Sequence, residues 1–314
     1  LYLGGPGAIF WMWLIALIGM ATSFAESTLA QAYKTKDADG NFRGGPAYYM
    51  QNGLGKRWMG TLFSLCLILA FGLVFNAVQS NSIAAAFEVA FDVPKYIVGI
   101  CLVIGSGIII FGGLKTISRF AEMVVPFMAL AYLLVALYVC AINFTALPDV
   151  LVLIIKSAFG IEQAGAGAIG YGVTQAMIQG IKRGLFSNEA GMGSAANAAA
   201  TATPYPPHPA SQGYVQMLGV FIDTIVICTA TASLILLSQQ LVPESGVMGI
   251  ELTQAALQEH VGDWGTYFIA IAILFFAFTS IVANYSYAET NLMFLEHNSN
   301  KGMFIFRLVV LGMV

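Results

Sequence analysis

Residues 182–191, KRGLFSNEAG, interrupt a long stretch of small and apolar residues and decide which fold the chain adopts. The whole stretch covers residues 165–203, begins rich in glycine and resumes with small residues after the interruption. The interruption holds three charges and several polar residues, which cannot continue a helix that faces lipid. Irregular backbone is tolerated at membrane depth only where it is buried in protein or lines a cavity. We therefore predict a non-helical break over residues 184–191 that faces an internal cavity. The alternative is a cytoplasmic loop between two shorter helices.

The composition around this stretch excludes several classes of protein. Of the 314 residues, 58% are hydrophobic and 9% are charged, whereas a soluble domain carries about 25% charged residues. So few charges cannot cover the surface of a water-soluble globule. The net charge of −3 offers no basic footprint for nucleic acid. A soluble enzyme, a disordered chain and a nucleic-acid binder are thus excluded, and an integral membrane protein is expected.

About eight apolar segments follow from the hydropathy of the chain. They cover residues 6–33, 59–91, 96–113, 120–144, 165–203, 212–238, 264–295 and 302 onward. Two further stretches, 149–159 and 247–260, predict short amphipathic helices at the membrane interface. We expect an all-α, polytopic helix bundle that forms a single transmembrane domain over residues 1–314. Because the chain begins with Leu1 and its last segment is too short to span a bilayer, we expect a fragment cut at both ends.

Lysine and arginine gather in the first, third and last connections between these segments. The first connection alone holds five of them, and residues 239–263 hold none. Basic loops face the cytoplasm in membrane proteins. The alternation of basic and non-basic connections requires the stretch 165–203 to cross the membrane once.

Asp223 is the ionisable residue placed deepest in an apolar segment. An ionisable group within hydrocarbon is a functional candidate by default, so Asp223 is expected to belong to an ion pathway. The alternative is a carboxylate that only joins two helices. Glu88, Glu122 and Glu289 fall near the ends of predicted helices and are expected at the interface.

Thr279 and Ser280 place two adjacent hydroxyl groups in the middle of the segment 264–295. Hydroxyl oxygens are hard ligands that suit Na⁺ when carbonyl groups complete the site. The alternative is that both hydroxyls bond to carbonyls of their own helix, which is common for Ser and Thr in membrane helices. Asn284 shares a face with Ser280, and Gln79 belongs to a polar group inside the segment 59–91.

No other metal site or cofactor is expected. Each cysteine stands alone inside an apolar run, and the histidines fall in polar connections; these residues are Cys66, Cys101, Cys140, Cys228, His208, His260 and His297. An intramembrane hydrolase would need a nucleophile and a base such as histidine within its membrane segments, and a channel would need a repeated filter motif. The sequence favours neither, so an enzyme is not expected.

Three motifs resemble the alanine or glycine:cation symporter family of amino-acid carrier proteins. They are GGPAYYM at residues 44–50, LFSNEAGMGS at 185–194 and the segment 276–285. The resemblance extends over essentially the whole chain. It implies the leucine-transporter type of fold, with five-plus-five inverted repeats and broken first and sixth helices. In that fold the stretch 165–203 corresponds to the broken sixth helix, and the first broken helix and the C-terminal helices lie outside this sequence.

The resemblance also implies the residues of the site. Gln79, Phe186, Ser280 and Asn284 would line the substrate pocket, and Thr279 and Ser280 would bind Na⁺. Ser187 and Asn188 join the pocket because they lie within the expected break. Many members have Gly-Trp where this chain has Ala283-Asn284.

The function implied is symport of a small neutral amino acid with Na⁺ by alternating access, in a multi-pass protein of the bacterial inner membrane. Na⁺ would act as the coupling ion, with no other cofactor. The alternative is a proton-coupled amino-acid permease or another small-solute carrier. The sequence leaves the choice of amino acid, the coupling stoichiometry and the oligomeric state open.

Overall fold

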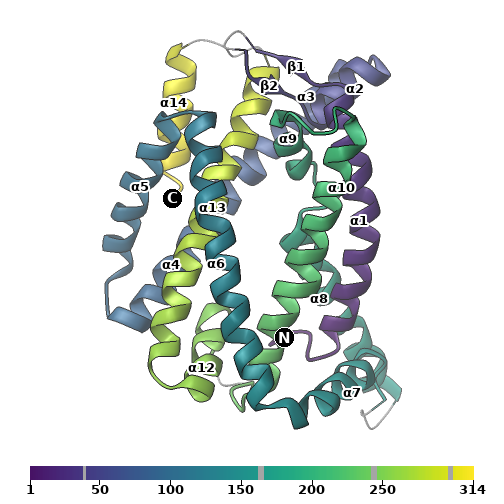
Figure 1. Cartoon of the computed structure of the whole chain (residues 1–314), viewed down its shortest axis with the longest axis vertical. Helices are drawn as coiled ribbons and strands as arrows, with labels where there is room; N and C mark the ends of the chain where they lie inside the picture. The colour runs from purple at the N-terminus through teal and green to yellow at the C-terminus, as the bar shows by residue number, and fades with distance from the viewer. Residues whose placement is uncertain (38–39, 162–165, 242–245, 296–299) are drawn as a thin grey trace. The chain divides into compact units, whose positions relative to one another are not determined.

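The computed structural model describes residues 1–37, 40–161, 166–241, 246–295 and 300–314 (Figure 1). Within these residues the regular elements are helices and one two-stranded hairpin. The helices are α1 Ala8–Ala32, α2 Pro46–Leu54, α3 Arg57–Leu67, η1 Ile68–Val74, α4 Phe75–Phe91, α5 Lys95–Phe111, α6 Leu114–Ile142, η2 Phe144–Ala146, α7 Leu147–Ala158, α8 Ala166–Asn188, α9 Ser194–Thr201, α10 Pro209–Val220, η3 Phe221–Cys228, α11 Thr229–Leu236, α12 Ile250–Val261, α13 Trp264–Phe294 and α14 Asn300–Leu311. The hairpin pairs β1 Thr35–Lys36 with β2 Phe42–Arg43 in antiparallel register.

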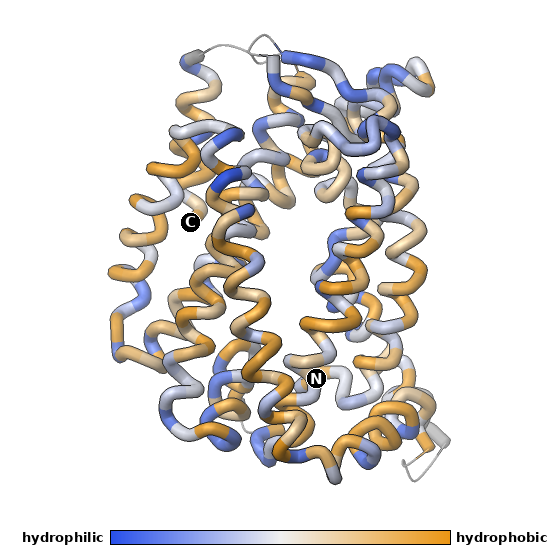
Figure 2. The backbone as a smooth tube through the Cα atoms, in the orientation of Figure 1, coloured by the Kyte–Doolittle hydropathy of each residue, from blue (hydrophilic) through white to orange (hydrophobic). Residues whose placement is uncertain are grey.

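The helices agree with the apolar segments of the sequence, and the two short stretches expected to be amphipathic form α7 and α12. Among the described residues, five helical stretches have the length and apolar composition to cross a membrane, and α5 is a shorter apolar helix. The five are Ala8–Ala32, Arg57–Phe91, Lys115–Ile142, Pro209–Leu236 and Trp264–Phe294. Figure 2 shows hydrophobic residues along these helices and hydrophilic residues at the hairpin. The chain is therefore a multi-pass membrane protein built from α-helices.

Two of these stretches contain π-helical turns in their middle. The π-helix η1 lies between α3 and α4, and η3 lies between α10 and α11. A π-helical turn widens the helix and leaves carbonyl groups without their usual i+4 partner, and such turns are frequent at functional sites. Asp223 lies within η3, and Asn76 is the second residue of α4, just after η1.

The chain divides into two compact units. Unit 1 comprises Leu1–Ser23, Ala129–Gly191 and Val215–Ile269, and unit 2 comprises Phe24–Met128, Met192–Tyr214 and Ala270–Val314. In unit 1, buried residues of α1, α7 and α11 form a hydrophobic core; they are Ile9, Met12, Val150, Ile154 and Ala232.

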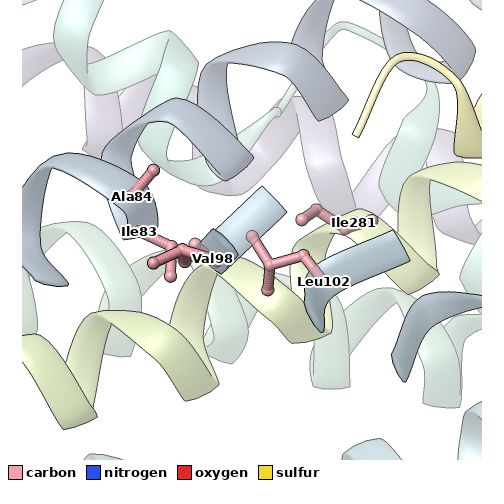
Figure 3. Close-up of a cluster of buried hydrophobic side chains, with 6 residues drawn as sticks. Ile83, Ala84, Val98, Leu102 and Ile281 are labelled. Atoms are coloured by element: carbon pink, nitrogen blue, oxygen red, sulfur yellow. The ribbon is translucent and has the colours of Figure 1, made fainter. Parts of the chain in front are cut away.

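Unit 2 has a core at which α4, α5 and α13 meet. Figure 3 shows Ile83 and Ala84 of α4, Val98 and Leu102 of α5, and Ile281 of α13 gathered in this cluster. Ile83 and Ile281 are completely buried. Because lipid chains are as apolar as these side chains, close van der Waals packing holds the helices of this cluster together. The cluster fixes α13, which carries Thr279, Ser280 and Asn284, against its neighbours in unit 2.

The break in the stretch 165–203 is shorter than the sequence suggested. Helix α8 continues through Asn188, and the amide of Glu189 still donates to the carbonyl of Leu185 at 2.9 Å. The prediction of a break beginning at residue 184 is therefore wrong, and the non-helical residues are 189–193. Their backbone is left-handed at three positions, Glu189, Gly191 and Gly193.

The glycine that suggested the early break serves helix packing instead. A Cβ on Gly184 would lie 2.4 Å from Cγ2 of Ile15 in α1, and a Cβ on Gly180 would lie 2.3 Å from the carbonyl oxygen of Ala8. Small residues let membrane helices approach closely. Gly180 and Gly184 are one turn apart on α8, so they form the face on which α1 rests.

Candidate functional site

In unit 1, the last turn of α8 is bonded to the π-helix η3. The hydroxyl of Ser187 donates to the carboxylate of Asp223, and it lies 3.2 Å from the hydroxyl of Thr224. Asn188 Nδ2 donates to Thr224 Oγ1 at 3.1 Å, and Thr224 Oγ1 lies 3.4 Å from Asp223 Oδ2. The end of α8 thus meets a carboxylate and a hydroxyl from a second helix.

The side chain of Asn188 also stabilises the break itself. Its Oδ1 accepts the backbone N–H of Ala190 at 3.0 Å, and Asn188 is only 8% exposed. Gly19 of α1 lies against this turn, because a Cβ there would come within 3.2 Å of the Cβ of Ala190. The left-handed residue Glu189 is therefore held between an ordered helix end and a closely packed neighbour.

A cavity of about 370 Å³ in unit 1 adjoins this cluster. Cys228 lies on the cavity wall, and its sulfur is 3.1 Å from the hydroxyl of Ser187. Gln179 and Arg183 of α8 also line it. Asp223 is half-buried beside two hydroxyls, an oxygen set that suits a hard cation. A carboxylate that only joins two helices would make the same bonds, so the ion-pathway assignment of Asp223 stays a prediction.

In unit 2, the hydroxyls predicted to bind Na⁺ bond to carbonyls of their own helix. Thr279 Oγ1 lies 3.0 Å from the carbonyl of Phe275 and 2.9 Å from that of Phe276, and Ser280 Oγ donates to Phe276 at 3.1 Å. A hydroxyl has one donor and two lone pairs. Both oxygens can therefore accept a cation while they donate along α13.

Asn284 lies on α13 with these hydroxyls, and Gln79 lies on α4 in the same unit. Asn284 is buried, and its Nδ2 donates to Oδ1 of Asn76 at 3.1 Å, while Asn76 Nδ2 donates to the carbonyl of Gly72 in η1. Gln79 is half-buried one turn beyond Asn76 on α4. Phe186 is half-buried on the last turn of α8 in unit 1. The expected pocket residues thus belong to two units, and no observation tests their contact with a substrate.

Glu289 corrects an expectation from the sequence. It is 5% exposed rather than interfacial, because two arginines surround it: Arg43 Nη1 lies 3.5 Å from Oε2, and Arg307 Nη2 lies 3.4 Å from Oε1. Its Oε1 also accepts the hydroxyl of Tyr285 at 3.0 Å. Glu88 and Glu122, by contrast, are exposed, and their position at the interface stays a prediction.

Arg43 connects this cluster to the hairpin. It is 6% exposed, its Nε lies 3.1 Å from Asp37, and its Nη1 donates to Thr290 Oγ1 at 3.0 Å. Burial alone would raise the pKa of Asp37, but the amide of Asn41 and the guanidinium of Arg43 outweigh it and hold that pKa below its usual value. In the sequence, Asp37, Arg43 and Glu289 stand in separate segments, so nothing there indicates that their side chains meet.

The motif at residues 44–50 has a packing role that the sequence did not reveal. A Cβ on Gly45 would lie 2.5 Å from Oδ1 of Asn197 in α9, so only glycine fits between them. Asn197 Oδ1 accepts Nδ2 of Asn291 at 3.1 Å, and Asn291 Oδ1 accepts the hydroxyl of Ser64 at 3.0 Å. The motif thus packs against an amide network that joins α3, α9 and α13 within unit 2.

The described residues contain no group of three or more His, Cys, Asp or Glu side chains placed to hold a metal ion. His208 precedes α10 and His260 lies on α12, whereas His297 lies outside the described residues. Among the described residues, the oxygen atoms that we predict to bind a cation are those of Asp223 in unit 1 and of Thr279 and Ser280 in unit 2.

Comparisons with known proteins agree with the motifs. The model of the sodium:alanine symporter family matches residues 1–314. The chain is 55% identical over 312 residues to a probable sodium/glutamine symporter of Bacillus subtilis, GlnT, and 52% identical over 311 residues to the amino-acid carrier protein AlsT of the same organism. Each alignment covers 99% of this chain, and 63% and 64% of those two relatives. The sodium/proton-dependent alanine carrier protein of Bacillus sp. PS3 is 41% identical, over 97% of this chain and 70% of that protein. The chain therefore spans somewhat less than two thirds of the length of its first two relatives.

Proposed function

The chain belongs to the sodium:alanine symporter family, and on that basis we propose that it forms part of a secondary transporter in the bacterial cell membrane. The transporter moves a small neutral amino acid together with Na⁺ by alternating access. A proton-coupled permease for amino acids or other small solutes is the alternative, because one relative is named as both sodium- and proton-dependent.

The observation that carries the proposal is the interrupted helix of residues 166–201. Helix α8 ends at Asn188, five non-helical residues follow, of which three are left-handed, and α9 begins at Ser194. Interrupted helices in transporters expose backbone groups that bind substrate and ions. Here the interruption lies directly beside Asp223 and Thr224, which supply oxygen ligands.

The roles we propose follow the two units. In unit 1, Phe186, Ser187 and Asn188 contact the amino acid, and Asp223 belongs to the cation pathway. In unit 2, Gln79, Ser280 and Asn284 contact the amino acid, and Thr279 and Ser280 bind Na⁺. Hydrogen bonds to Asp223 and Thr224 orient Ser187 and Asn188. In unit 2, bonds to Asn76 and to carbonyls of α13 orient Asn284, Thr279 and Ser280.

Transport by the purified full-length transporter in proteoliposomes tests the function. Counterflow of labelled alanine, glycine and glutamine is measured with Na⁺ inside and outside, with choline in its place, and with a proton gradient alone. We expect exchange of alanine or glycine that requires Na⁺. Exchange driven by the proton gradient without Na⁺ would favour the alternative, and absence of exchange under all three conditions would contradict the proposal.

The Na⁺ assignment is tested by Thr279→Val combined with Ser280→Ala, which removes two oxygen ligands and keeps the shape of the side chains. The apparent affinity for Na⁺ should fall at least about tenfold, or about 1.4 kcal/mol. Ser286→Ala is the matched control, because it removes a hydroxyl from the same helix that bonds only to the carbonyl of Ala283 in the described contacts. Equal Na⁺ activation in all variants would reject the assignment.

Asp223→Asn distinguishes the ion pathway from a packing role. The amide keeps the volume of the side chain and can still accept the hydroxyl of Ser187, but it carries no charge. Loss of Na⁺-dependent transport with unchanged thermal stability would support the pathway. Normal transport would leave Asp223 as a carboxylate that only joins α8 and η3.

A further inference from the structure

The cavity of about 370 Å³ in unit 1 has a single charged side chain among the described residues that line it, and this is Arg183 of α8. Arg183 is exposed, and it forms no hydrogen bond or ion pair within the described part of the chain. An ionisable group in a stretch that crosses the membrane is a functional candidate. The guanidinium of Arg183 can therefore pair with an anion that enters the cavity.

The cavity lies at the end of unit 1 that the charge pattern places outside the cell. Its walls include residues 1–4, which precede α1, and three residues at the start of α12, namely Met248, Gly249 and Leu252. Figure 1 shows the N-terminus and α12 in the lower part of the view. Residues 239–263, the connection that holds α12, contain no lysine or arginine, whereas basic connections face the cytoplasm. A solute from the outer side would therefore reach this cavity.

One face of α8 connects the cavity to the proposed transport residues. Gln179, Arg183 and Ser187 follow one another at intervals of four residues, which places them on one side of a helix. Gln179 and Arg183 line the cavity, and the hydroxyl of Ser187 lies 3.1 Å from the sulfur of Cys228 in the cavity wall. Ser187 also donates to the carboxylate of Asp223. Along this face, a cation at Arg183 is thus followed one turn later by a hydroxyl that is bonded to an anion.

This order of charges fits the zwitterion of an α-amino acid. A guanidinium presents paired N–H donors that match the two oxygens of a carboxylate, and the amide of Gln179, one turn earlier, adds a further donor. The remaining walls are mostly apolar and include Ile9, Met12 and Ala232. A second carboxylate on the ligand would meet these apolar walls without a second cation, which is unfavourable. The cavity volume lies within the range of small-ligand sites.

We propose that Arg183 binds the carboxylate of the transported amino acid on the outer side of the candidate transport site. Gln179 donates a second hydrogen bond to the carboxylate, and the ammonium group of the ligand points along α8 toward Ser187 and Asp223. Arg183 thereby selects α-amino acids that carry a free carboxylate and a neutral side chain. The inference rests on the proposed function, because it takes an amino acid as the substrate.

Binding of a labelled amino acid to the purified full-length transporter in saturating Na⁺ tests the proposal. The probe is whichever of alanine, glycine and glutamine the parent exchanges best. Arg183→Gln should weaken its binding at least tenfold. Lys182→Gln is the matched control, because Lys182 is the adjacent exposed cation on α8 and does not line the cavity, and it should change the affinity less than twofold. Equal affinities of the two variants would overturn the inference.

Competition by the α-amide of the same amino acid shows whether Arg183 contacts the carboxylate. The amide keeps the shape of the ligand but lacks the negative charge. The preference of the parent for the acid over the amide should fall at least tenfold in Arg183→Gln and stay unchanged in Lys182→Gln. Arg183→Lys keeps the charge without the paired donors, so its preference should lie between the two. An unchanged preference in Arg183→Gln would overturn the contact, because a merely structural role would weaken both ligands alike.

A labelling experiment tests the cavity without a change at Arg183, and so holds even where Arg183→Gln does not fold. A membrane-impermeant maleimide is applied to Gln179→Cys, and mass spectrometry measures the modification of the introduced cysteine. The amino acid should slow this modification at least fivefold, whereas its α-amide should not. Ile178→Cys is the control, because Ile178 is an exposed neighbour that does not line the cavity. Labelling of Gln179→Cys at the same rate with and without the amino acid would overturn the site.

Counterflow by the parent separates this inference from the proposed function. A parent that exchanges none of the three amino acids would overturn the proposed function, and the role of Arg183 with it. A parent that exchanges one of them while Arg183→Gln binds it with the affinity of Lys182→Gln would overturn the role of Arg183 alone.

Discussion

Replacement of Arg43 by alanine should strongly destabilise unit 2. Arg43 contacts the carboxylates of Asp37 and Glu289 at 3.1 and 3.5 Å, and all three side chains are 7% exposed or less. Removal of one partner from a buried ion pair costs about 3–5 kcal/mol, since the other charge stays buried without compensation. In this case two carboxylates would lose the same cation.

The change is measurable as thermal unfolding of the purified protein in detergent. A loss of 1 kcal/mol lowers the melting temperature of a large domain by about 2–4 °C, so Arg43→Ala should melt at least about 6 °C below the parent. Lys95→Ala is the control, because its ion pair with Glu88 is about half exposed and such pairs contribute only about 0–1 kcal/mol.

A second substitution tests whether Arg43→Ala destabilises the protein through the uncompensated carboxylates or through the lost volume of the arginine side chain. Glu289→Gln in the Arg43→Ala background removes one of the two uncompensated carboxylates, so the double variant should melt above Arg43→Ala alone. A difference of less than about 2 °C between Arg43→Ala and the Lys95→Ala control would be smaller than the smallest shift expected for Arg43→Ala. In that case the network does not carry the stability that its burial indicates.

Three further predictions follow from the packing and the charges. Gly180→Ala should lower the melting temperature, because its Cβ would lie 2.3 Å from the backbone oxygen of Ala8. Gly219→Ala is the control: its Cβ would meet nothing within 4 Å, so the melting temperature should stay unchanged or rise. Equal melting temperatures of the two variants would contradict the close contact at Gly180. Gly193→Ala should also melt earlier, because its φ is 79° and two side chains lie within 3 Å of the added carbon; a melting temperature equal to the parent would show that the turn can adapt. The pKa of Asp37 is lowered in the folded protein. Its contribution to stability is therefore present above the unfolded pKa of about 3.9 and is lost as the pH falls through the lower folded pKa. The melting temperature should fall below about pH 4, and Asp37→Asn should reduce this fall; identical pH dependence in the two proteins would contradict the pairing.

The helices could be predicted from the sequence because lipid imposes a simple rule on each of them separately. A span needs about 20 apolar residues whatever its neighbours are, so each of the apolar runs at α1, α6 and α13 predicts a membrane-spanning helix by itself. The short helices α7 and α12 were readable for a similar reason, since their polar and apolar residues alternate with helical period.

The sequence does not locate the break, because a glycine can open the backbone or let two helices pack closely, and both roles look the same in a sequence. The sequence predicts that the backbone opens at Gly184, yet this residue lies within α8 and leaves room for Ile15 of α1. The backbone opens instead at Glu189, which adopts a left-handed conformation that glycine or asparagine would ordinarily supply. Asn188 bonds to the amide of Ala190, and Gly19 packs against Ala190, so both hold the turn that contains this glutamate.

The buried polar networks were missed because each depends on residues that are far apart in the chain. Asn76 meets Asn284, Ser64 meets Asn291, and Arg43 meets Glu289, at separations of more than 200 positions. The resemblance pointed to Asn284 through its motif, but nothing in the local sequence of Glu289 distinguished a buried, doubly paired carboxylate from an interfacial one.

Within unit 2 these contacts converge on one helix, and this has a consequence for transport. Along α13, the hydroxyls of Thr279 and Ser280 come first, then Asn284 bonded to α4, then Glu289 and its neighbours bonded to the hairpin, α3, α9 and α14. A shift of α13 against unit 2 would break every one of these buried bonds, and buried donors and acceptors left unpaired cost about 1–3 kcal/mol each. We therefore expect the predicted Na⁺ ligands to keep their positions relative to α4 and the hairpin throughout the cycle. A disulfide between Cys substitutions at Ser64 and Asn291, which join α3 to α13 and are not proposed transport residues, should then leave transport intact relative to the uncrosslinked double variant. Loss of transport that a reductant restores would show that α13 slides within its own unit.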